Sequence, residues 1–193
     1  MNLDPAMSAP VLVAYGSKHG ATAEIAERIA GVLRAGGVAV DLRPARAVGS
    51  VDGYRAIVLG SAVYMRRWRR DPAQLLRRIR RAAGTGPVWL FSSGPFGEMP
   101  EDPVKLIPRR VRESAGRAPV REHVLFGGRV PPDAANIIER AMLKNTPVGR
   151  RDLRDWDAIA AWAGVIAAAL QPSKPAAHRL QGSHTPVSPG GIV

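Results

Sequence analysis

The sequence predicts an α/β protein built on a doubly wound parallel sheet of five strands, with helices on both faces. Two observations predict this class: short, apolar, β-rich runs that end in glycine or serine, and stretches of helical period between them. Alternation of strand and helix along a chain is typical of a parallel sheet. The length of 193 residues fits one such domain, because an eight-stranded barrel needs about 250 residues.

The predicted strands are the apolar runs. Four of them are strong and one is weaker, and they cover residues 11–15, 56–59, 88–91 and 123–126, with the weaker strand at 38–42. Glycine or serine follows each strong run directly. Ligands of doubly wound sheets bind beyond the carboxyl ends of the strands, and small residues there let the backbone approach a ligand closely. We therefore expect a binding site at this edge.

Two helices are predicted from the period of their apolar residues and from their end signals. The first covers residues 22–35, with Gly36 as its left-handed terminal residue. The second opens with Asp71 as N-cap and Pro72 as the first helical residue, and it ends by Gly84.

The remaining helical signals lie in the second half of the chain. Asp102-Pro103 is a possible helix start, although Pro108 would kink that helix or restart it. Residues 131–151 form an additional amphipathic stretch, whose apolar residues include Ile137, Ile138 and Met142. A final helix begins near Asp152 or Asp155.

We predict a single folded domain over residues 10–171, preceded by an N-terminal extension at 1–9. From residue 172 to 193 the chain is rich in Pro, Ser, Gly and His with no period, so we predict a disordered tail.

Composition excludes several kinds of protein. The absence of cysteine excludes disulfide scaffolds, thiolate catalysis, iron–sulfur clusters and cysteine zinc sites. The longest apolar run, residues 158–170, is shorter than the roughly 20 residues of a membrane-spanning helix. Because the N-terminus also lacks the pattern of a secretion signal, we expect a cytoplasmic protein.

The loop between the first strand and the first helix has the residues of a phosphate-binding loop. A phosphate there would meet unpaired backbone N–H groups and the positive end of the helix dipole. Ser17 and Thr22 would add hydroxyl donors, Gly20 would let the backbone come close, and Lys18 would add charge. The glycine patterns of ATP-binding and dinucleotide-binding loops are missing, so those ligands are disfavoured.

This loop resembles the phosphate-loop signature of the flavodoxin family. The matching residues are Val13, Tyr15, Ser17, Gly20, Thr22, Ala26 and Ile29, whereas Ala14 departs from the pattern. Residues 60–65, 89–95 and 154–157 resemble the branch of this family that contains the menaquinone-dependent protoporphyrinogen oxidases of bacteria. The resemblance covers roughly residues 10–171. It implies a flavodoxin-like sheet of strand order 2-1-3-4-5 and noncovalently bound FMN as cofactor.

The resemblance also implies which residues hold FMN. The phosphate would be held by Ser17, Lys18, His19, Gly20, Ala21 and Thr22. Two loops would clasp the isoalloxazine ring: Ser61, Ala62, Val63 and Tyr64 in one, and Ser92, Ser93, Gly94, Pro95, Phe96 and Gly97 in the other. A flavin needs apolar walls and hydrogen-bond donors at its pyrimidine edge. The candidate walls are Tyr64, Trp68 and Phe96, each with core packing as its alternative role, and the candidate donors are the amides of Ser93, Gly94 and Gly97.

The formal charge of +12 is concentrated in arginines, eight of which lie between positions 66 and 81. The later four, Arg77, Arg78, Arg80 and Arg81, fall opposite an apolar stripe, which favours a solvated helix face. Arg66 and Arg67 directly follow the first ring loop, and we predict that they and Trp68 face a substrate or partner. Positive charge there would stabilise the anionic reduced flavin and raise its potential, as suits transfer of electrons in pairs.

The leading hypothesis is an FMN-dependent oxidoreductase that passes electrons from an organic substrate to a quinone-type acceptor. Protoporphyrinogen oxidation, a step of haem biosynthesis, is the first choice on resemblance alone. The flavin performs the chemistry, so no catalytic side chain is predicted. An NAD(P)H-quinone reductase and a flavodoxin-type carrier that docks to a redox partner protein stay open as alternatives.

The same arginines could bind other anionic partners. The arginines and the stretch 131–146 could contact acidic lipids, which would place the protein peripherally at the inner face of the membrane. Nucleic-acid binding through the arginines is disfavoured. The four histidines lack metal-ligand spacing, so no metal site is predicted.

Overall fold

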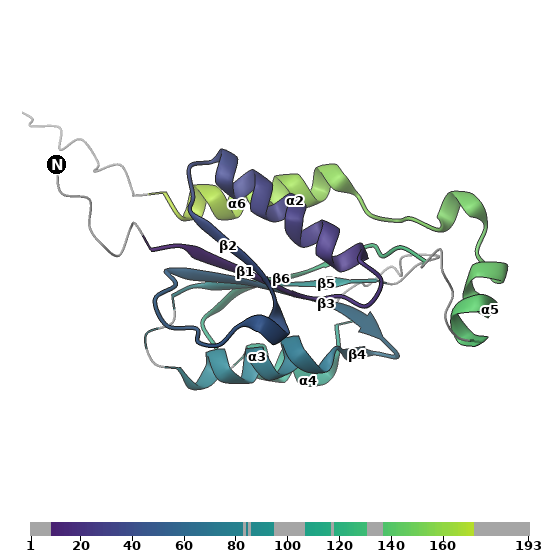
Figure 1. The fold of residues 1–193 in the computed structure, drawn as a ribbon, viewed down its shortest axis with the longest axis horizontal. Helices are drawn as coiled ribbons and strands as arrows, with labels where there is room; N and C mark the ends of the chain where they lie inside the picture. The colour runs from purple at the N-terminus through teal and green to yellow at the C-terminus, as the bar shows by residue number, and fades with distance from the viewer. Residues whose placement is uncertain are drawn as a thin grey trace, which may run out of the picture.

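The computed structural model describes residues 9–82, 84, 86–94, 107–116, 118–130 and 137–171. Its centre is a parallel sheet in the strand order β2-β1-β3-β5-β6. Helices α2 and α6 cover one face of the sheet, and α3 and α4 cover the other (Figure 1). The predicted class is confirmed, and so is the predicted strand order, since β5 and β6 are the fourth and fifth parallel strands.

The parallel strands are β1 (Val11–Gly16), β2 (Val40–Pro44), β3 (Ala56–Tyr64), β5 (Val88–Ser93) and β6 (Val120–Phe126). A two-residue strand, β4 (Arg67–Trp68), pairs antiparallel with the end of β3 and was not predicted. The helices are α2 (Ala21–Ala35), α3 (Arg70–Arg81), α4 (Arg109–Ala115), α5 (Ile137–Asn145) and α6 (Trp156–Ala169), with short 3-10 turns at Ala45–Ala47 and Val148–Arg150.

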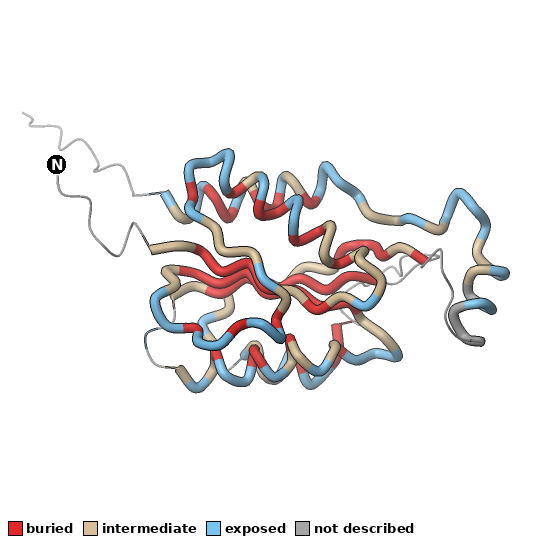
Figure 2. The backbone as a smooth tube through the Cα atoms, viewed as in Figure 1, coloured by how far each residue is buried: buried red, intermediate tan, exposed pale blue. Residues whose placement is uncertain are grey.

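The strands separate two apolar cores. In β1, Val11 and Val13 belong to the core under α2 and α6, whereas Leu12 and Ala14 belong to the core over α3 and α4. A strand with both faces buried has a continuous apolar sequence, and this is why the central strands could be recognised. Figure 2 shows the buried strands between two helical layers whose outer faces are exposed.

The end of α2 differs from the prediction by one residue. Gly36 has a φ of −79°, so it is not the left-handed residue, and Gly37 takes that conformation with a φ of 78°. The amide of Val38 then donates to the carbonyl of Leu33, which closes the helix end. Because the Val38 amide donates to the helix end and not to a neighbouring strand, β2 begins two residues later than predicted, at Val40.

Helix α3 begins earlier than predicted. It starts at Arg70, so Asp71 is not its N-cap and Pro72 is not its first residue. The N-cap is Arg69, whose amide donates to the Ser61 hydroxyl over 3.0 Å and so fixes the helix start against β3. A proline is tolerated here because the first-turn amides of a helix have no partner within the helix.

Among the remaining predicted helix starts, the structure describes those near Pro108 and Asp155. The possible start at Asp102 lies outside the described residues, and α4 begins directly after Pro108. The Asp155 carboxylate accepts hydrogen bonds from the amides of Asp157 and Ala158, so Asp155, and not Asp152, caps α6.

Helix α5 falls within the predicted amphipathic stretch and lies beyond the carboxyl edge of the sheet (Figure 1). The side chains of Ile137, Ile138 and Met142 lie outside the described residues. So do residues 1–8 and 172–193, which leaves the predicted extension and tail untested. In the part of the chain that is described, no helix is long and apolar enough to cross a membrane.

Gly60, in the middle of β3, leaves room for a core aromatic ring. A Cβ at this position would lie 1.9 Å from the Cζ atom of Phe91 on the neighbouring strand. The Phe91 ring is fully buried and has Phe126 and Trp162 as aromatic neighbours, with ring centroids 6.1 and 6.3 Å away. The ring therefore has no free space into which it could move.

We predict that Gly60→Ala lowers the free energy of unfolding by about 3 kcal/mol, because overpacking displaces this ring. Gly31→Ala is the matched control: a Cβ there meets nothing within 4 Å, and alanine in a helix interior should stabilise by about 0.5–1 kcal/mol. Urea unfolding of both variants measures the difference. Equal stability of Gly60→Ala and the unchanged protein would contradict the packing described.

Candidate functional site

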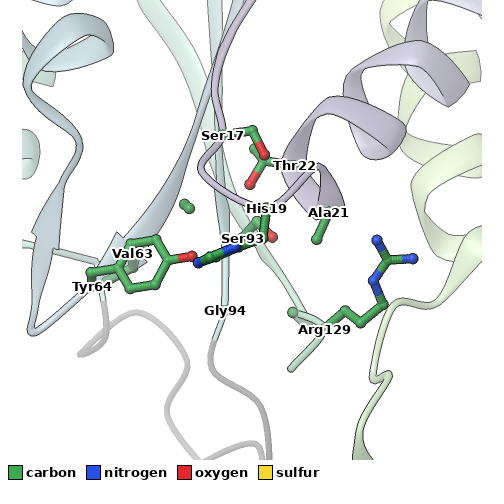
Figure 3. A pocket seen from close by; sticks show the side chains of 11 residues that line it. Ser17, His19, Ala21, Thr22, Val63, Tyr64, Ser93, Gly94 and Arg129 are labelled. Carbon is green, nitrogen blue, oxygen red and sulfur yellow. The ribbon is translucent and has the colours of Figure 1, made fainter. Parts of the chain in front are cut away.

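A pocket at the carboxyl edge of the sheet brings together the loop after β1, the last residues of β3, the end of β5 and the segment after β6. Strand register explains this meeting: Gly16 pairs with Ser61, Ala62 with Ser93, and Ser93 with Phe126, so β1, β5 and β6 end at nearly one level and β3 continues past them to Tyr64. The lining residues, shown in Figure 3, are Ser17, His19, Ala21, Thr22, Ala62, Val63, Tyr64, Ser93, Gly94, Gly128 and Arg129.

The loop from Ser17 to Thr22 has the geometry expected of an anion-binding loop. Gly20 is the N-cap of α2, has a φ of 85°, and offers no side chain to the amides of the first turn. The Ser17 and Thr22 hydroxyls lie where this loop turns into the helix (Figure 3). Backbone amides, hydroxyls and the helix dipole thus converge on one place, which is the donor set that a phosphate prefers.

The opposite wall of the pocket is the end of β3. Tyr64 is half-buried and points its hydroxyl toward the middle of the pocket, and Val63 lies beside it (Figure 3). This wall has the apolar, planar character that a ring system needs.

The floor of the pocket contains Ser93 and Gly94 from the end of β5. Gly94 has a φ of 118°, which favours glycine, and its amide donates to the carbonyl of Phe126 over 3.0 Å. This amide is therefore already used and is not the ring donor that was predicted.

Two predicted site residues, Ser61 and Ser92, do not line the pocket. Both lie in strands and not in loops: the hairpin with β4 extends β3 past Ser61, and β5 continues past its predicted end to Ser93. The Ser61 hydroxyl accepts the amide of Arg69, and the Ser92 hydroxyl accepts the indole N–H of Trp68 over 2.8 Å. These serines position α3 and the hairpin.

Trp68 was a candidate ring wall, and the structure places it in the core beneath the hairpin. It is 7% exposed and lies edge-on to His123, with ring centroids 5.6 Å apart. It does not line the pocket. The predicted contacts Pro95, Phe96 and Gly97 lie outside the described residues.

Gly128 and Arg129 line the pocket although sequence reasoning missed them. The Arg129 guanidinium pairs with Glu24 on α2 over 2.7 Å, and the same carboxylate pairs with Arg154 over 2.7 Å. Arg154 also pairs with Asp152 over 2.6 Å, and its side chain is only 3% exposed. The glycines at positions 127 and 128 are a local signal for a loop here, but no local pattern indicates the pairing of Arg129 with Glu24.

This four-residue charge network joins the segment after β6 to the start of α2. Hydrogen bonds from Arg154 are the largest cause that lowers the pKa of Glu24 and of Asp152, so both carboxylates are ionised at neutral pH. The Arg154 guanidinium also lies over the Trp156 ring, 4.5 Å from its centroid. The network holds Arg129 at the mouth of the pocket. Within the described ranges, no group of three or more acidic or histidine side chains could hold a metal ion.

Comparison with known proteins gives the family. The flavodoxin domain model matches residues 12–165. No curated protein matches the chain. Among solved structures, a cysteine-to-serine mutant of flavodoxin from Pseudomonas aeruginosa has a TM-score of 0.57 at 20% identity, covering 83% of this chain and 98% of that one.

Two further solved structures share the fold. Oxidised flavodoxin 2 from Bacillus cereus has a TM-score of 0.54 at 17% identity and covers 84% of this chain and 97% of that one. The metal-soaked flavodiiron core from Synechocystis has a TM-score of 0.56 at 15% identity and covers 86% of this chain but 36% of that one.

The chain belongs to the flavodoxin domain family. Its cofactor is accordingly FMN, and its fold is the FMN-binding, electron-transfer fold of that family. The flavodoxin part of the sequence prediction is confirmed.

His123, on β6 next to Ser92 and Trp68, is a half-buried neutral base. Its Nε2 atom lies 3.0 Å from the Ser92 hydroxyl, and burial lowers its pKa to about 4. This pKa is below the value of about 6.5 that a histidine has in the unfolded chain. The contribution of neutral His123 to the free energy of unfolding is therefore fully present above about pH 6.5. The stabilisation is lost as the pH falls toward 4, since the unfolded chain takes up the proton first.

We predict that the free energy of unfolding falls by about 2 kcal/mol between pH 7 and pH 5 because of His123. His123→Gln should remove most of this fall, whereas the carboxylates with lowered pKa values titrate below this range. Urea unfolding at the two pH values tests the prediction. The same fall in both proteins would show that His123 is not its source.

Proposed function

We propose that the protein is an FMN-dependent oxidoreductase that takes electrons from an anionic organic substrate and passes them to a quinone-type acceptor. The first candidate substrate is protoporphyrinogen, which carries propionate groups. The observation that carries the proposal is a pocket that joins the loop from Ser17 to Thr22 to an apolar wall at Tyr64, with an arginine-bearing turn directly after that wall in the chain.

The described residues fit FMN, and we assign them as follows. The Gly20 amide region, the Ser17 and Thr22 hydroxyls and the start of α2 would bind the phosphate. A Cβ at Gly20 would lie 3.6 Å from a carboxylate oxygen of Glu24 and 4.0 Å from a guanidinium nitrogen of Arg129, so this loop is next to the Glu24–Arg129 ion pair, whose two charges offset each other. Val63 and Tyr64 would contact the ring. Bound FMN supplies the redox chemistry of the site.

The turn after Tyr64 supports an anionic substrate. Tyr64 pairs with Arg67 across a two-residue hairpin turn, in which Met65 and Arg66 both have positive φ values, 46° and 58°. Such a turn fits the twist of the strands but is unfavourable for residues other than glycine, asparagine or aspartate. Both arginines are exposed and are held next to the pocket wall. They would orient carboxylates of a substrate at the pocket mouth.

Steady-state turnover tests this proposal. Under anaerobic conditions, the purified FMN-loaded protein should oxidise protoporphyrinogen with a menaquinone analogue as acceptor. Each cycle removes two electrons and two protons from the substrate, and the quinone takes up the same number to become a hydroquinone. Turnover with NAD(P)H alone would instead support a quinone reductase, and the absence of any turnover would leave an electron carrier.

The two turn arginines should also raise the flavin potential. We predict that Arg66→Ala with Arg67→Ala lowers the two-electron potential by on the order of 20 mV, the effect that Coulomb's law in water gives for two unit charges at an assumed separation of about 10 Å. Arg28→Ala with Arg121→Ala, a loss of two exposed arginines elsewhere, is the control and should leave the potential unchanged. Dye-equilibrated redox titration measures both. An equal shift of the potential in the control would show that the effect does not depend on the position of Arg66 and Arg67, and would contradict their local role.

A further inference from the structure

A second hollow, of about 340 Å³, lies beneath the β3–β4 hairpin and against α3 and α4. Its residues come from the hairpin, from both helices and from Pro108, and none of them lines the pocket described above. Its volume lies within the range of about 300–1,000 Å³ that is typical of small-molecule sites. We call it the lower groove.

The rim of the lower groove is strongly basic. Five exposed arginines border it: Arg66, Arg67, Arg77, Arg109 and Arg110. Arg109 pairs with Glu113 over 2.6 Å. Among the residues that the structure describes, no acidic side chain pairs with the other four. Guanidinium groups gathered around one hollow repel one another, so a bound anion would relieve this repulsion.

The floor of the lower groove is apolar and fixed. Trp68, Leu76 and Val111 belong to the core over α3 and α4 and are 7%, 1% and 4% exposed. The hydrogen bond from the Trp68 indole to the Ser92 hydroxyl holds the ring in place. A concave apolar floor within a ring of positive charge is complementary to a molecule that has an apolar body and an anionic head. A flat membrane surface would not reach this floor.

We infer that the lower groove is a binding site for a small soluble amphiphile that carries a carboxylate. The apolar body lies on Trp68, Leu76 and Val111, and the carboxylate accepts hydrogen bonds from the rim guanidinium groups, which suit its planar, two-oxygen geometry. The site goes beyond the proposed function. Arg66 and Arg67 line the groove and not the pocket, although their turn directly follows Tyr64 of the pocket wall. Binding in the groove requires neither FMN nor turnover.

Isothermal titration of the full-length protein, as purified with its cofactor, tests the inference with dodecanoate below its micellar concentration. We expect binding of one dodecanoate per chain. Arg77→Gln with Arg110→Gln should weaken it at least about tenfold, a loss of one or two charge-assisted hydrogen bonds. The matched control, Arg28→Gln with Arg121→Gln, removes the same charge outside the groove and should change the affinity less than twofold.

A second variant tests the groove without changing its charge. Ser114 lies on α4 at the groove, and Ser114→Phe should fill the hollow and weaken dodecanoate at least tenfold while the melting temperature stays unchanged. If Ser114→Phe has a lowered melting temperature, the affinity of the Arg77→Gln with Arg110→Gln variant decides whether the inference stands.

Three results would overturn the inference: no dodecanoate binding, equal weakening in the control pair, or unchanged affinity in the Arg77 and Arg110 variant. Vesicles of phosphatidylglycerol in phosphatidylcholine test whether the arginines instead bind the anionic headgroups of a membrane. Vesicle binding without dodecanoate binding would overturn the small-molecule site and assign the arginines to a membrane surface.

Discussion

The register of the parallel strands is the constraint on which the rest of the structure depends. Backbone hydrogen bonds align these strands so that β1, β5 and β6 end at nearly one level, with Gly16 opposite Ser61 and both Ser93 and Phe126 level with Ala62 of β3. A slip of one residue would exchange the two faces of a strand and move Val11 and Val13 out of their core. The pocket is a consequence of this alignment, because its lining residues come from four separate segments.

The fold and the first loop could be predicted because their signals are local. A strand that is buried on both faces leaves an uninterrupted apolar run, and the loop from Ser17 to Thr22 has a sequence whose donors are all adjacent in the chain. The helix ends were predicted less accurately. Gly37, and not Gly36 as predicted, has the left-handed conformation. Arg69, and not Asp71, is the N-cap of α3, because the Arg69 amide donates to the hydroxyl of Ser61, which is distant in sequence.

The rest of the site depends on contacts between residues far apart in sequence. Arg129 reaches the pocket because Glu24, more than a hundred residues earlier, holds it together with Arg154. No local pattern marks such a partner. A long-range contact also explains why Trp68 is not the ring wall that its position next to a ring loop predicts. Its indole N–H donates to the Ser92 hydroxyl, and this hydrogen bond holds the ring in the core.

The β3–β4 hairpin divides the carboxyl edge into two chemical environments. On one side, Tyr64 and the phosphate loop form a pocket whose arginine, Arg129, belongs to a network of two arginines and two carboxylates with Glu24, Arg154 and Asp152. On the other side, five arginines surround an apolar floor, and among the described residues only Arg109 has an acidic partner. One hairpin thus supports both a cofactor site and a separate place for an anion.

The central claim is that the loop between β1 and α2 binds the phosphate of FMN. The most direct test is the visible spectrum of the purified protein, with mass spectrometry of the molecule released on denaturation and a melting curve of the stripped protein in FMN or riboflavin. A yellow protein that releases FMN, and a melting temperature raised far more by FMN than by riboflavin, are the predicted results. A colourless protein whose melting temperature saturating FMN leaves unchanged would contradict the claim.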